Sequence, residues 1–203
     1  MIFKQISVGT VQNFSYIIGD ETTGEVAIVD PAWEIDKLLS ICDDLNVKVS
    51  YIINTHSHSD HVEGNDILRQ RTGAKVVMHA SSSLAKDILV HESDTIKVGK
   101  IEMKVMHTPG HCPDHICLLF DSKLLTGDTL FVGECGRTDL AGGSSSDMYD
   151  SLNKILRLND DVEIYPGHDY GVTRSSTIGF ERQHNYTLKR RTREEFIQFM
   201  KEP

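Results

Sequence analysis

One short segment of the chain carries several side chains that can bind a divalent metal ion. The segment Thr-His-Ser-His-Ser-Asp-His, residues 55–61, follows an apolar run at residues 49–53 that reads as a buried strand. His56 and His58 are two residues apart, so in an extended segment both imidazoles point to the same side and can face one ion. Asp60 and His61 come where the chain bends toward a helix, and can reach a second position beside the first. This cluster predicts metal binding.

Three more residues of the same kind lie at the ends of other strand-like runs. His111 follows Thr-Pro-Gly, Asp128 follows Thr-Gly, and His168 follows Pro-Gly. In the two histidine motifs, glycine permits a sharp turn and proline stiffens it, so each strand end becomes a fixed arm that carries an imidazole. The Asp128 carboxylate could bridge two ions. We therefore expect the fold to bring these residues to the 55–61 segment.

The donor types indicate which chemistry the expected site performs. Imidazoles and carboxylates without thiolates suit zinc, iron or manganese, and not a closed structural zinc site. The expected ligands are too many for one tetrahedral ion: His56, His58, Asp60, His61, His111, Asp128 and His168. They fit two divalent ions about 3.5 Å apart with a shared water, an arrangement used for hydrolysis. Asp60 and Asp128 are expected to take part in catalysis as well as in metal binding.

The other histidines are expected to be ordinary surface or core residues. They are His79, His91, His107, His115 and His184. For His115, the alternative is that it orients a metal ligand from behind the site.

Length and composition are those of an ordinary globular protein. The 203 residues are enough for one core or at most two small ones, and the content is 39% hydrophobic and 25% charged. The net charge of −9 argues against nucleic acid and anionic membrane as partners. No apolar run approaches the roughly 20 residues of a membrane span, and no signal peptide is visible, which favours the cytoplasm.

The hydrophobic pattern predicts successive strands, a helix, a strand and a helix, and then repeats that order. Strands are expected at 2–8, 13–18, 25–29, 47–53, 75–79, 94–98, 101–107, 115–120, 123–127 and 162–165, and helices at 34–45, 63–72, 148–156, 175–185 and 192–200. Residues 81–87 are a short helix or a loop, and the Gly- and Ser-rich segment 129–147 is a functional loop. The order favours two sheets packed face to face with helices outside, over a single doubly wound sheet.

Together, the motifs resemble the metallo-β-lactamase superfamily in order and spacing, over most of the chain. The resemblance implies a four-layer αββα fold of the α/β (α+β) class, as a single domain over 1–203 with a short C-terminal helical extension at 170–203. It also implies two metal sites: His56, His58 and His111 would hold one ion, Asp60, His61 and His168 the other, and Asp128 would bridge them.

Two branches of the superfamily are similar to this chain. Residues 125–131 and 133–137 resemble glyoxalase II, which implies hydrolysis of hydroxyacylglutathione thioesters such as S-D-lactoylglutathione by a metal-bound hydroxide. Residues 137–139 and 165–170 look more like the persulfide dioxygenases, in which one Fe(II) held by two histidines and one aspartate oxidises glutathione persulfide with O2. Carried over, that iron would be held by His56, His111 and Asp128.

The chain departs from two-domain glyoxalase II enzymes after His168. Only about 35 residues follow, so the large C-terminal helical domain that helps to bind glutathione is absent or reduced to two helices. The thiol carrier is therefore open. Candidates for holding an anionic substrate are Arg137, Tyr170, Arg174 and Arg182, with surface ion pairing as the alternative for each arginine. The expected partner is a small thioester or thiol-derived molecule, and a homodimer is left open.

Overall fold

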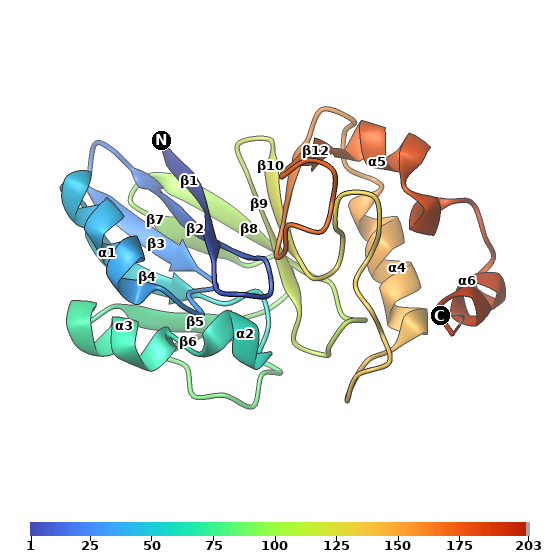
Figure 1. The fold of residues 1–203 in the computed structure, drawn as a ribbon, viewed down its shortest axis with the longest axis horizontal. Helices are drawn as coiled ribbons and strands as arrows, with labels where there is room; N and C mark the ends of the chain where they lie inside the picture. Colours follow the sequence, from blue (N-terminus) through green and yellow to red (C-terminus); the bar gives the residue numbers. More distant parts are fainter. Residues whose placement is uncertain (202–203) are drawn as a thin grey trace.

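The computed structural model describes residues 1–201 and contains two six-stranded sheets packed face to face (Figure 1). The first sheet has the order β1-β2-β3-β4-β5-β6 and the second the order β12-β11-β10-β9-β8-β7. The strands of the first sheet are β1 (Ile2–Val8), β2 (Asn13–Asp20), β3 (Glu25–Val29), β4 (Lys48–Ile53), β5 (Lys75–His79) and β6 (Ile88–Val90). Those of the second are β7 (Thr95–Val98), β8 (Ile101–His107), β9 (Ile116–Phe120), β10 (Lys123–Gly127), β11 (Glu163–Pro166) and β12 (Ser176–Thr177).

Both sheets are mixed, and their parallel pairs decide where the functional loops emerge. In the first sheet β3 runs parallel to β4, with Val29 opposite Ile53. In the second sheet β10 runs parallel to β11, with Gly127 opposite Pro166. Parallel neighbours end at the same edge of a sheet, so the segments that follow each pair of strands start side by side.

Helices cover the outer face of each sheet (Figure 1). On the first sheet they are α1 (Ile35–Asp44), α2 (Ser59–Val62) and α3 (Asn65–Thr72); next to the second they are α4 (Ser145–Ile155), α5 (Ile178–His184), the 3-10 turn η1 (Tyr186–Leu188) and α6 (Arg193–Phe199). Helix α1 shows why they dock, because its buried residues Ile35, Leu38 and Cys42 recur at a spacing of three and four and form one apolar stripe.

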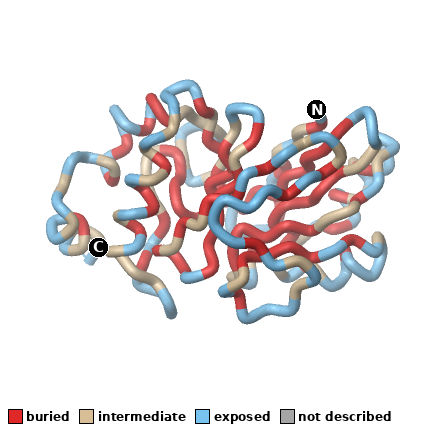
Figure 2. The backbone as a smooth tube through the Cα atoms, turned by 180° about the vertical axis from the view of Figure 1, so that it is seen from behind, coloured by how far each residue is buried: buried red, intermediate tan, exposed pale blue. Residues whose placement is uncertain are grey.

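Three layers of core hold the sandwich together. One lies between the sheets and includes Phe14, Ile53 and Leu125. A second lies under α1 and α3, and a third under α4 and α6. Figure 2 shows the buried positions concentrated in the strands and the exposed ones along the helices and loops. This is the expected four-layer αββα arrangement, and the antiparallel start over β1, β2 and β3 is also as predicted.

The structure adds elements that the hydrophobic pattern did not predict. Residues 81–87 form a loop, and directly after it β6 pairs in parallel with β5. The segment after His168 is not wholly helical, because β12 adds an antiparallel strand to β11. Helix α4 starts at Ser145, earlier than the expected residue 148, with the Ser144 hydroxyl accepting a hydrogen bond from the Asp147 amide. Between residues 1 and 201, no helix combines the length and the apolar character needed to span a membrane.

Candidate metal centre

The loops after four strands meet at one edge of the sandwich and bring the expected ligands together. The segment after β4 carries residues 55–61, and it is fixed to the end of β3 by Asp30. The Asp30 carboxylate accepts hydrogen bonds from the Thr55 amide and the Thr55 hydroxyl, each at 2.7 Å. Asp128 follows β10 and His168 follows β11, so the parallel pairing of these strands places the two residues next to each other.

A first group of donor atoms comes from His56, His58 and His111. His58 Nδ1 lies 3.1 Å from His56 Nε2 and 2.8 Å from His111 Nε2. His56 and His111 are buried, whereas His58 is partly exposed, so the group is open to solvent on one side.

A second group comes from Asp60, His61 and His168. The Nε2 atoms of His61 and His168 are 3.3 Å apart. Asp60 Oδ2 lies 3.5 Å from His61 Nε2 and 3.4 Å from His168 Nε2. Helix α2 carries both Asp60 and His61, and the His61 ring also lies against the His56 ring, with centroids 4.1 Å apart, so the two groups adjoin.

The Asp128 carboxylate lies between the two groups. Its Oδ2 is 3.6 Å from His111 Nε2 and 3.3 Å from His168 Nε2, and its Oδ1 is 3.4 Å from His61 Nε2. Oδ1 is buried and has no hydrogen-bond partner among the described residues. A buried carboxylate oxygen without a partner is costly, and a cation is one way to satisfy it.

These distances fit divalent metal ions. Four nitrogen or oxygen ligands at about 2.0–2.1 Å from a tetrahedral zinc lie roughly 3.3 Å from one another. The donor atoms described above have separations between 2.8 and 3.6 Å. The donors are imidazoles and carboxylates with no thiolate, which is typical of catalytic sites and not of closed structural ones. The residues present therefore fit two ions, one in each group, with Asp128 shared.

The two groups differ in their protonation. Burial, followed by the neighbouring histidines His61 and His115, lowers the pKa of His56 well below its usual range, and burial also lowers the pKa of His58. In the second group, burial of His168 is outweighed by Asp128 and Asp60, and the pKa rises to about 9. Near neutral pH and without metal, His56 and His58 are thus neutral imidazoles, whereas His168 carries positive charge beside Asp60 and Asp128.

Contacts behind the ligands fix which nitrogen of each histidine faces the centre. His61 Nδ1 lies 3.1 Å from Asp30 Oδ2, His111 Nδ1 lies 2.9 Å from the Arg137 carbonyl and His168 Nδ1 lies 3.0 Å from the Val11 carbonyl. Because oxygen accepts in each case, Nδ1 carries a proton and Nε2 is the nitrogen that faces the centre. On His168, whose pKa is raised, Nε2 also holds a proton that a metal ion would displace.

Two residues in this outer layer were not anticipated from the sequence. Asp30 stands between strand β3 and Pro31, and a positive φ of 50° at this buried aspartate is unusual. Asn13 is buried in β2, and its side-chain amide donates to the carbonyl and to the carboxylate of Asp60, at 3.0 and 3.1 Å. No local signal predicts Asn13, because its partner is distant in the sequence.

The four residues expected to bind substrate lie in different surroundings in the structure. Tyr170 stacks on the His168 ring with centroids 4.7 Å apart and planes at 12°, and is 47% exposed, so it lies at the mouth of the centre. The Arg137 carbonyl accepts a hydrogen bond from His111. The Arg137 guanidinium donates from Nε and Nη2 to the two carboxylate oxygens of Asp139, each at 2.6 Å.

The other two arginines have partners elsewhere. Arg174 lies over the Phe14 ring, with its guanidinium carbon 4.8 Å from the centroid, and donates to the Ser7 hydroxyl. Arg182 pairs with Asp160 and donates to the carbonyls of Leu156 and Leu158 at the end of α4. In the described part of the chain, none of the ion pairs or hydrogen bonds of Arg182 involves an expected metal ligand.

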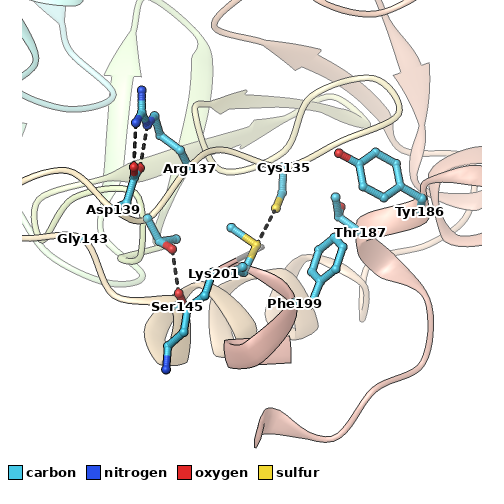
Figure 3. A pocket seen from close by; sticks show the side chains of 11 residues that line it. Cys135, Arg137, Asp139, Gly143, Ser145, Tyr186, Thr187, Phe199 and Lys201 are labelled. Carbon is cyan, nitrogen blue, oxygen red and sulfur yellow. Dashed lines mark hydrogen bonds and ion pairs between the residues drawn. The ribbon is translucent and has the colours of Figure 1, made fainter. Parts of the chain in front are cut away.

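A pocket of about 750 Å³ lies beside the metal centre, between the 135–145 loop and the C-terminal helices (Figure 3). Arg137 and Asp139 lie on one side of Cys135, and Tyr186 and Phe199 on the other. The pocket thus has a charged end and an aromatic end. None of the expected metal ligands is among the described residues that line it, but Arg137 connects the two, because its carbonyl accepts the hydrogen bond from His111.

Comparison with known proteins agrees with this architecture. Residues 8–168 match the profile of the metallo-beta-lactamase superfamily. A hydroxyacylglutathione hydrolase from Pelagibacter ubique (strain HTCC1062) is 36% identical over 182 residues, covering 87% of this chain and 75% of that protein. The mitochondrial persulfide dioxygenase ETHE1 of Homo sapiens is 33% identical over 205 residues, covering 98% of this chain and 80% of that protein. The crystal structure of ETHE1 from Myxococcus xanthus is 36% identical, with a TM-score of 0.95 over 99% of this chain and 90% of that one. With its profile match and these relatives, the chain belongs to the metallo-beta-lactamase superfamily.

Proposed function

We propose that the protein is a metallohydrolase with two ions, acting on thioesters of the hydroxyacylglutathione type. The observation that carries this proposal is the position of Asp128, whose carboxylate oxygens lie within 3.6 Å of nitrogens from both ligand groups. A complete second group, Asp60 with His61 and His168, is what hydrolysis by two ions requires. Bound there, the ions would supply an activated water and a Lewis acid for the thioester carbonyl.

The chain's own residues provide the remaining steps. Asp128 Oδ1 has no hydrogen-bond partner among the described residues, so it is available to an ion of the second group while Oδ2 faces His111 of the first, and Asp128 would hold both ions in place around the attacking water. Asp60 Oδ2 accepts from the Asn13 amide and faces His61 and His168, so Asn13 fixes the carboxylate that would hold the second ion and its water. A thiolate is a good leaving group, so the cleavage needs no strong acid from the protein.

The pocket beside Arg137 is proposed to take the thiol carrier. Its charged end suits a carboxylate of the carrier, for which Arg137 would exchange its present partner Asp139. Its aromatic end, with Tyr186 and Phe199, suits the apolar part of an extended molecule. Tyr170 would line the path of the acyl group, because it stacks on His168 at the mouth of the centre.

A second candidate is a persulfide dioxygenase with one Fe(II). It is favoured by the match to the ETHE1 crystal structure over 99% of this chain. In that case His56, His111 and Asp128 would hold the iron, and His111 Nε2 lies 3.6 Å from Asp128 Oδ2.

A paired assay separates the two candidates. The protein is stripped with a chelator, reloaded with zinc or with Fe(II), and assayed for thiol release from S-D-lactoylglutathione and for O2 consumption with glutathione persulfide. We expect thiol release that disappears on stripping and returns with zinc. Oxygen consumption in the iron form, with no thiol release in either form, would overturn the hydrolase proposal in favour of the dioxygenase.

A further inference from the structure

His115 lies directly behind the metal centre and is completely buried. Its Nε2 accepts a hydrogen bond from the Asp128 main-chain amide at 2.9 Å. Its Nδ1 lies 3.0 Å from the hydroxyls of both Thr108 and Thr129. Both ring nitrogens are therefore engaged by the protein, and neither is available to a metal ion.

These partners allow only one form of the imidazole. An amide N–H is always a donor, so His115 Nε2 must be unprotonated, and Nδ1 must carry the proton. The hydroxyls can accept that proton, because Thr129 Oγ1 is within 3.3 Å of the Thr108 carbonyl and can direct its own hydrogen there. The contact network fixes a neutral Nδ1–H tautomer.

The main chain near Asp128 is shaped to approach this ring. Gly127 has a φ of +46°, and a Cβ at this position would lie 2.5 Å from His115 Nε2. The Gly127 carbonyl accepts the Gly167 amide at 2.8 Å, which ties the same turn to the segment that carries His168. The His115 ring also stacks on the ring of His56, with centroids 5.0 Å apart and planes at 28°. One imidazole thus supports ligands of both groups.

We propose that His115 is a positioning residue that, as the Nδ1–H tautomer, holds the Asp128 main chain where its carboxylate reaches both ligand groups. The proposal rests on the metal binding proposed above. The hydrogen bond from the Asp128 amide to His115 is present in the metal-free chain as well. A histidine that merely filled the core would contribute to stability and not to the metal centre. A positioning role depends on Nε2, which accepts from the Asp128 amide, whereas a packing role depends on neither ring nitrogen in particular.

Two amide substitutions distinguish the nitrogens. In His115→Gln the side-chain oxygen can occupy the place of Nε2 and accept from the Asp128 amide. In His115→Asn the shorter amide can replace only Nδ1, so the Asp128 amide loses its acceptor. Both variants remove the ring, and asparagine leaves a cavity larger by one methylene, so the unfolding midpoint is needed to separate the packing loss from the effect on metal. Metal retention against graded chelator and the Co(II) absorption spectrum are measured beside the thermal unfolding midpoint.

We expect His115→Asn to bind metal roughly 10- to 100-fold more weakly and to change the Co(II) spectrum, whereas His115→Gln stays within a few fold of the parent. Equal effects of the two substitutions on metal binding would overturn the proposal. If His115→Asn does not fold, nitrogen NMR of the histidines in the unsubstituted protein decides. A His115 with unprotonated Nε2 and protonated Nδ1, with and without metal, supports the proposal, and a protonated Nε2 overturns it.

Discussion

Asp30 Oδ2 lies 3.1 Å from His61 Nδ1, and both side chains are almost completely shielded from solvent, with 2% and 0% exposure. The same carboxylate accepts hydrogen bonds from the amide and hydroxyl of Thr55, the residue before His56. Asp30 therefore supports both ligand groups through one side chain. A carboxylate behind a metal-binding histidine fixes the ring and raises its basicity toward the metal.

Replacing Asp30 with asparagine is expected to weaken metal binding. Asp30→Asn keeps the shape but turns one acceptor into a donor, which opposes the proton on His61 Nδ1. We expect metal affinity to fall roughly 10- to 100-fold, measured as metal retained against graded chelator. Asp94→Asn is the matched control. Like Asp30, Asp94 pairs with a histidine, here His91 at 3.5 Å, but the pair is exposed. Equal metal loss in both variants would contradict the role given to Asp30.

Removing the Asp128 carboxylate is expected to empty the centre. Asp128→Ala takes away the only side chain whose oxygens approach nitrogens of both groups in the described chain. We expect loss of both ions and a fall in thioesterase activity of more than about 100-fold, by elemental analysis and thiol release. Asp139→Ala, which removes an exposed carboxylate, should keep both ions. Two retained ions in Asp128→Ala would show that the bridging assignment is wrong.

Loading of the second group is expected to depend on pH more steeply than loading of the first. The pKa of His168 is raised to about 9, because Asp128 and Asp60 outweigh its burial. Near neutral pH it holds a proton that a metal must displace, so the affinity of the second group should rise with pH until about 9. His56 and His58 have lowered pKa values and are already neutral there.

Calorimetry in buffers of different ionisation enthalpy measures the protons released as each ion binds. We expect a proton to be released from His168 when the second group binds its ion, and little release from His56 and His58 when the first group binds. Equal release for the two ions, or a second affinity that does not change above neutral pH, would contradict the described protonation.

The pocket beside the metal centre is expected to govern substrate affinity. Arg137→Ala removes the cation at its charged end, so KM should rise with little change in kcat. Arg182→Ala is the matched control, because this arginine is held by Asp160 and the end of α4. It should cost about 1 kcal/mol of stability and leave KM unchanged. A rise in KM for Arg182→Ala alone would place the carrier elsewhere.

Most of the fold follows from local pattern. The long strands alternate or run apolar over five or more residues, and α1 shows a clear stripe, so their types are evident before any packing is known. β6 and β12 were missed because they are three and two residues long, too short for any period to show. They exist because β5 and β11 offer unpaired edges, which is a property of the sheets and not of the short segments.

The residues of the candidate site also fall into two classes, those that the sequence motifs predict and those that only the folded structure identifies. The expected metal ligands share side-chain types that rarely cluster without metal, so their gathering was predictable from motifs alone. Asp30, Asn13 and His115 act through partners that only the folded sheets bring near, and each has an ordinary structural reading in the sequence. Arg182 was a candidate for binding an anionic substrate, with surface ion pairing as the alternative. In the structure it forms an ion pair with Asp160.

Both ligand groups are expected to hold an ion during thioester hydrolysis. Elemental analysis of protein purified without added metal, combined with thiol release from the same sample, tests it most directly. We expect two divalent ions per chain, and we expect chelation to remove them together with the thioesterase activity. A single iron per chain, in protein that consumes O2 with glutathione persulfide and releases no thiol from the thioester, would contradict it.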